Sequence, residues 1–122
     1  LLPRGWMMPF GFNAVRGKVL VDGNTISGRV YLLGLSVQPT YTAGTTTQTA
    51  VEAIVKLRNG LVDTGDVLIE VPVKMMKGFP AGIGFDYAEH GGYVLFPDGL
   101  YTDFTFTTGD TDDMAFSVSY QV

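Results

Sequence analysis

Five aspartates in the C-terminal part of the chain could supply ligands to a cation. Asp110, Asp112 and Asp113 lie within four positions, and Asp98 and Asp103 precede them closely. Calcium takes six to eight oxygen ligands, and carboxylates clustered in a loop can provide several of them. The stretch lacks the twelve-residue EF-hand spacing, however, and a solvated acidic turn or a contact for a basic neighbour accounts for the same residues. We favour the solvated turn and assign no metal ligand.

The chain has one histidine, His90, within Glu89-His-Gly-Gly92. Glu89 or Asp86 could orient its imidazole as a general base. The sequence has no cysteine, and none of its serines stands in a Gly-x-Ser-x-Gly nucleophile elbow. A single histidine in a turn is typical of an exposed polar residue. We therefore assign no catalytic residue and expect a protein that is not an enzyme.

Glycines and tyrosines offer two further kinds of ligand site. Gly78, Gly82 and Gly84 form a glycine-rich stretch, but the Lys-Ser/Thr pair of a phosphate-binding loop is missing and no helical pattern follows, so no cofactor is predicted. Tyrosine combines an apolar ring with a polar edge, which suits sugar binding. Four tyrosines near Asp and Asn residues make a glycan-binding module the alternative function: Tyr41, Tyr87, Tyr93 and Tyr101.

The composition limits the protein class. The 122 residues suffice for one domain and one core, and sixteen glycines with six prolines favour an all-β chain rich in turns. Net charge is −4 and the eight Lys and Arg residues do not cluster, so we expect neither nucleic acid nor a membrane surface as a partner. Only 16% of residues are charged and mean hydropathy is +0.22, which predicts that apolar surface is buried between subunits.

Short alternating segments separated by turn residues must position these side chains. Residues 49–58 place Val51, Ala53, Val55 and Leu57 on one face, and Asn59-Gly60 ends the segment. Pro72 lacks an amide hydrogen, so its strand should lie at a sheet edge or end there. Gly34 should mark a bulge or a close backbone approach. The other predicted strands are 17–22, 29–38, 67–74, 83–87, 93–96, 100–106 and 116–120. Alternation aligns Val67, Ile69, Val71 and Val73 on one face of 67–74, and Ile83, Phe85 and Tyr87 on one face of 83–87. The pattern predicts an antiparallel β-sandwich of about eight strands, jelly-roll-like, over residues 17–122.

Residues 1–16 follow neither the strand nor the helix period. They contain Pro3 and Pro9 together with several large apolar side chains, which are unfavourable in water. We expect an extended N-terminal arm that packs on this subunit or on a neighbour. Its predicted interface residues are Trp6, Met7, Met8, Phe10 and Phe12.

Residues 51–122 resemble a small β-sandwich domain found in structural proteins of tailed-phage virions. The resemblance rests on Ala53-Ile-Val-Lys-Leu-Arg-Asn-Gly60, the apolar strand Val67 to Val73, the turn Phe96-Pro-Asp-Gly-Leu-Tyr101 and the closing strand Ala115-Phe-Ser-Val-Ser-Tyr120. The element Phe96-Pro-Asp-Gly-Leu-Tyr101 is the most specific part, and residues 1–50 carry no matching pattern.

The resemblance implies a role in assembly, on the head, neck or tail of a phage particle. We expect a capsid decoration, or cement, subunit on the virion surface that binds the major capsid protein or another virion protein. It also implies contacts with its own copies, and with the high apolar fraction it favours a homotrimer. A tail or neck component that acts as a receptor- or glycan-binding β-sandwich is the alternative.

Overall fold

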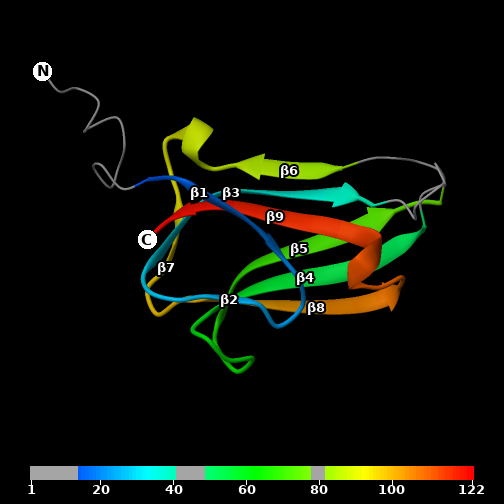
Figure 1. Cartoon of the computed structure of the whole chain (residues 1–122), viewed down its shortest axis with the longest axis horizontal. Helices are drawn as coiled ribbons and strands as arrows, with labels where there is room; N and C mark the ends of the chain where they lie inside the picture. Colours follow the sequence, from blue (N-terminus) through cyan, green and yellow to red (C-terminus); the bar gives the residue numbers. More distant parts are fainter. Residues whose placement is uncertain (1–13, 41–48, 78–81) are drawn as a thin grey trace, which may run out of the picture.

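The computed structural model describes residues 14–40, 49–77 and 82–122, which form two antiparallel sheets packed against each other (Figure 1). The strands are β1 (Arg16–Leu20), β2 (Thr25–Ile26), β3 (Val30–Pro39), β4 (Val51–Asn59), β5 (Val67–Met75), β6 (Ile83–Asp86), β7 (Val94–Phe96), β8 (Leu100–Thr108) and β9 (Met114–Gln121). Two 3₁₀ turns are η1 (Ala88–His90) and η2 (Thr111–Asp113). The predicted all-β sandwich is confirmed. In the described residues, no helix has the length and apolar character needed to span a membrane.

The order of the strands decides which of them are edges. The first sheet has the order β1-β9-β3-β6, and β7 pairs with β3 on the same side as β6. The second sheet has the order β2-β8-β4-β5. Strand β5 is thus an edge strand, as Pro72 predicted. The register of β3 against β9 shifts between Leu32 and Gly34, which confirms the bulge predicted at Gly34.

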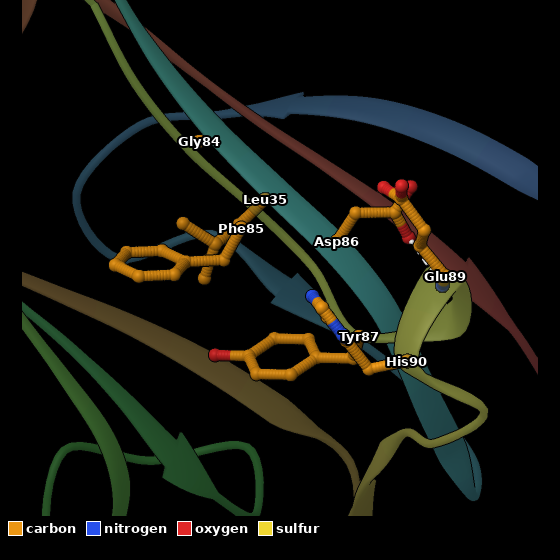
Figure 2. Close-up of a pocket in the computed structure, with 7 residues that line it drawn as sticks. All are labelled: Leu35, Gly84, Phe85, Asp86, Tyr87, Glu89 and His90. Carbon is orange, nitrogen blue, oxygen red and sulfur yellow. Dashed lines mark hydrogen bonds between the residues drawn. The ribbon is translucent and has the colours of Figure 1, made fainter.

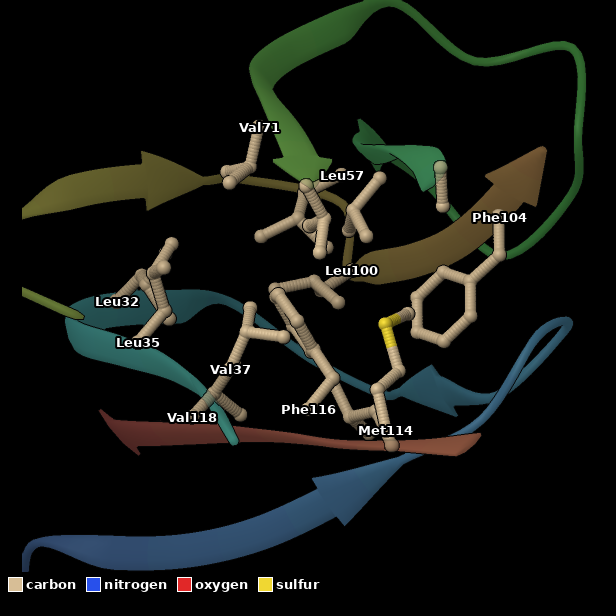
Figure 3. Close-up of a cluster of buried hydrophobic side chains, with 14 of the residues drawn as sticks. Leu32, Leu35, Val37, Leu57, Val71, Leu100, Phe104, Met114, Phe116 and Val118 are labelled. Atoms are coloured by element: carbon tan, nitrogen blue, oxygen red, sulfur yellow. The ribbon is translucent and has the colours of Figure 1, made fainter. Parts of the chain in front are cut away.

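The core lies between the two sheets and comes from the predicted alternation (Figure 3). The inward side chains of β4, including Val55 and Leu57, are fully buried, as are Phe116 of β9 and Phe96 of β7. The rings of Phe104 and Phe116 meet edge to face, with centroids 5.6 Å apart. Such contacts stabilise a core beyond the area that they bury.

Two predicted face assignments are wrong. Val67 was expected to align with the buried Val71 and Val73, but the β4–β5 register shifts between Leu57 and Arg58, and Val67 is exposed. Phe85 was expected to share a buried face with its neighbours, yet half of its side chain is exposed because β6 is an edge strand. In addition, β2 is too short for its alternation to be recognised, and β1 begins at Arg16, one residue before the predicted domain boundary.

Candidate binding surfaces

The turn between β4 and β5 carries a concentration of exposed apolar side chains at one end of the sandwich. Leu61 and Val62 lie in the turn, and Val67 and Leu68 begin β5. Their exposed fractions run from 39% for Val67 to 58% for Val62. We call these four residues the hairpin surface. Exposed apolar side chains favour contact with another macromolecule where they gather into one patch.

Polar contacts hold the turn that carries the hairpin surface. The Arg58 guanidinium donates from Nε to Asp103 Oδ2 and from Nη1 to the Gly65 carbonyl oxygen, both at 2.9 Å. Asn59 and Asp98 bond reciprocally, with Asn59 Nδ2 donating to Asp98 Oδ2 and the Asp98 amide donating to Asn59 Oδ1. The Asn59 amide also donates to the Asp66 carbonyl oxygen at 2.8 Å. The turn is therefore fixed before any partner binds, which lowers the entropic cost of binding.

A second candidate is a cavity of about 540 Å³ at the free edge of β6 (Figure 2). It is lined by Leu35, Gly84, Phe85, Asp86, Tyr87, Glu89 and His90. The structure thus brings His90 together with Asp86 and Glu89, the two acids considered as its partners. Burial raises the pKa of the Tyr87 phenol above its ordinary value, because desolvation disfavours the charged phenolate.

The geometry gives Asp86 a structural task. Its Oδ1 accepts the Glu89 amide at 3.0 Å, which ties the start of η1. The His90 amide donates to the Tyr87 carbonyl oxygen, and the His90 side chain is exposed. Neither acid is hydrogen-bonded to the imidazole in the described structure, so the geometry supplies no oriented base.

Four of the five aspartates considered for calcium have structural tasks, in two separate parts of the fold. Asp110 and Asp113 form a capping box around η2: the Asp112 amide donates to Asp110 Oδ1, and the Asp110 amide donates to Asp113 Oδ2, each at 2.9 Å. Asp98 and Asp103 belong to the contacts of the β4–β5 turn. Among the described residues, no group of three or more His, Cys, Asp or Glu could hold a metal ion.

We predict that Asp110→Ala lowers the free energy of unfolding by about 0.5–2 kcal/mol, because the cap of η2 is lost. Urea denaturation with and without added calcium measures the effect, which should be the same in both conditions. Asp112→Ala is the matched control, since its carboxylate makes no bond within the capping box. A calcium-dependent gain in melting temperature that Asp110→Ala removes would contradict the capping role and indicate a metal site.

The three described tyrosines considered for sugar binding lie in different surroundings. Tyr87 lines the β6 cavity, Tyr93 packs edge to face on Tyr31, and Tyr101 lies in the other sheet opposite Thr25. Tyr41 lies outside the described residues, as do the arm residues Trp6, Met7, Met8, Phe10 and Phe12.

Sequence reasoning missed the hairpin surface and the free edge of β6. The hairpin surface had one signal in the sequence: two apolar residues, Leu61-Val62, stand between the turn residues Asn59-Gly60 and Thr64-Gly65. Apolar residues are uncommon in a polar turn. The second depends on the strand order, which no local pattern reveals. Comparison of the chain with protein-family models, with curated proteins and with solved structures finds no match in any of the three.

Proposed function

We propose that this chain is a non-enzymatic structural subunit of a tailed-phage particle, and specifically a capsid decoration subunit that binds the shell and its own copies. The hairpin surface is the observation that carries the assembly role. The resemblance of residues 51–122 to virion β-sandwich domains supports the phage context. The mechanism is physical, because a rigid sandwich presents apolar side chains that are buried on contact.

The energetics of the hairpin surface suit a contact that is repeated over a lattice. Complete burial of a Val or Leu side chain contributes about 1.5–3 kcal/mol, and these side chains are already partly covered, so each supplies a fraction of that. One such contact is weak, but copies held by neighbouring subunits bind with a high effective concentration. The fixed turn also strengthens binding, because the turn loses little conformational entropy when it meets a partner.

Immunogold labelling of intact particles with antibody against the chain tests the particle assignment. Label spread over the head is expected for a decoration subunit. Label confined to the tail or its tip would replace this assignment with the tail-component alternative. Absence of label from particles of the phage that encodes the chain would contradict a virion role altogether.

Charge placed in the hairpin surface should prevent assembly without unfolding the domain. We predict that the double variant Leu61→Asp, Val62→Asp binds the particle at least about tenfold more weakly, since a buried, unpaired carboxylate is costly at an interface. Stability should change by about 0.5 kcal/mol or less, because both side chains are exposed.

Val19→Asp is the matched control for this double variant. Val19 is 60% exposed on β1, so the control places a charge on the other sheet at a site of similar exposure. Binding is measured by co-sedimentation with particles stripped of the native subunit. Equal binding by the double variant and the wild-type chain would exclude the hairpin surface as the contact.

A further inference from the structure

Among the described strands, β6 pairs on one side only, with β3, so its other edge has main-chain groups available for another strand. The Tyr87 amide donates to the Leu33 carbonyl oxygen at 2.8 Å, so Tyr87 directs its amide toward β3. In an antiparallel ladder, successive residues direct these groups to opposite sides. Gly84 and Asp86 therefore direct their N–H and C=O groups away from β3, at an edge where no described strand pairs with them.

The other long edges of the sandwich carry features that discourage strand addition. Edge strand β5 contains Pro72, which has no amide hydrogen, flanked by the exposed Glu70 and Lys74. Edge strand β1 carries the exposed cations Arg16 and Lys18. Proline and charged side chains are the usual protection of natural sheet edges. β6 is short and carries the exposed Asp86, but it has no proline and no lysine, so its one charge favours basic side chains on an added strand.

Side chains on the two sides of β6 differ in chemistry. Figure 2 shows the rings of Phe85 and Tyr87 projecting to one side of the strand and the carboxylates of Asp86 and Glu89 to the other. Phe85 is 51% exposed although it is aromatic. A further cavity of about 280 Å³ lies beside Asp86 and is lined in part by Ser36, Ser117 and Ser119.

Gly84 lies on β6 immediately before Phe85. A Cβ added there would meet only the Leu35 carbonyl oxygen, at 3.8 Å, which is an ordinary contact. The packing of this domain therefore does not require glycine at this position. A glycine within a strand often marks a place where another backbone approaches closely.

We propose that the edge of β6 binds, by strand addition, an extended peptide segment of a partner protein in which apolar and basic side chains alternate. Main-chain bonds to Gly84 and Asp86 hold the segment in register. Because side chains alternate along a strand, the apolar residues lie against Phe85 and Tyr87, and the basic residues face Asp86 and Glu89. The site is separate from the hairpin surface, which belongs to the other sheet.

Binding of a synthetic peptide tests this proposal on the whole chain, without any particle. The probe is a fluorescent seven-residue peptide of alternating valine and lysine, followed by anisotropy. One comparison peptide has glutamate in place of lysine, and a second carries N-methyl groups on alternate residues, which block main-chain pairing. The wild-type chain should bind the probe at least about tenfold more tightly than either comparison peptide, a difference of about 1.4 kcal/mol.

Two variants separate the contributions of backbone and charge. Gly84→Pro removes an outward amide hydrogen and leaves the bonds to β3 in place. Glu89→Lys reverses a charge whose carboxylate has no hydrogen bond or ion pair with the described residues, since Glu89 bonds to Asp86 through its backbone amide. Each should weaken probe binding about tenfold or more, while Asp63→Lys, the same charge reversal in the β4–β5 turn, should change it less than about twofold. Circular dichroism verifies folding, and Glu89→Lys keeps the test valid if Gly84→Pro unfolds.

Three outcomes would overturn the proposal. Equal binding of all three peptides would mean that neither pairing nor charge recognises the segment. Unchanged binding by Glu89→Lys would remove the acidic side of the site. Self-association of the chain that Gly84→Pro abolishes would make a second copy the occupant instead. Since no particle is used, none of these results bears on the virion assignment.

Discussion

Phe116→Ala should lower the free energy of unfolding by about 3–5 kcal/mol, out of the roughly 5–15 kcal/mol typical of a domain. The Phe116 side chain has 0% exposure and lies on β9, against Phe104. Its removal forfeits the transfer free energy of a large ring and leaves a cavity between two sheets that cannot close around it. Urea denaturation followed by circular dichroism measures the loss as a lower midpoint at an unchanged slope.

Phe85→Ala is the matched control, because it removes the same atoms from a half-exposed position at the sheet edge. This variant should lower the free energy of unfolding by about 1 kcal/mol or less, since half of the Phe85 side chain stays in water in the folded state. Similar losses in the two variants would contradict the assignment of Phe116 to the core. The pair also separates the roles of the two rings, because Phe85 is expected to matter for peptide binding and Phe116 for the fold.

Local alternation was enough to predict the core strands. In β4, the apolar side chains at every second position are the ones that the structure buries, and β9 behaves in the same way around Phe116. Strand and turn chemistry act over a few residues, so a single sequence carries them. The Pro72 edge and the Gly34 bulge were predictable for the same reason, since each follows from one residue's backbone chemistry.

Pairing between distant segments was not predictable, and the binding surfaces depend on it. Val67 leaves the buried face because of a register shift against β4. Phe85 is exposed on β6, which has a neighbour on one side only among the described strands. The acidic residues show the same limit. From the sequence alone, Asp98 and Asp103 are available carboxylates. In the fold, Asp98 bonds to Asn59, 39 positions away, and Asp103 bonds to Arg58, 45 positions away.

Gly65→Ala should disrupt the turn that holds the hairpin surface. A Cβ at position 65 would overlap the Asn59 carbonyl oxygen, and because this conflict is with backbone, no side-chain rotation relieves it. We expect a loss of about 1–3 kcal/mol or more in unfolding free energy, together with faster amide exchange at Asn59, whose bond to Asp66 closes the turn. Denaturation and hydrogen exchange measure the two effects.

Gly17→Ala is the control, because a Cβ on that residue of β1 would meet only the Val118 carbonyl oxygen, at 3.9 Å. This variant should change the free energy of unfolding by no more than about 0.5 kcal/mol. Unchanged exchange at Asn59 in Gly65→Ala would show that the turn adapts and is not held as described. If exchange rises and particle binding falls while the core remains protected, the geometry of the turn is itself part of the contact. If Gly65→Ala still binds the particle and only the Leu61→Asp, Val62→Asp variant loses binding, the contact depends on the apolar side chains. It then does not require a fixed turn.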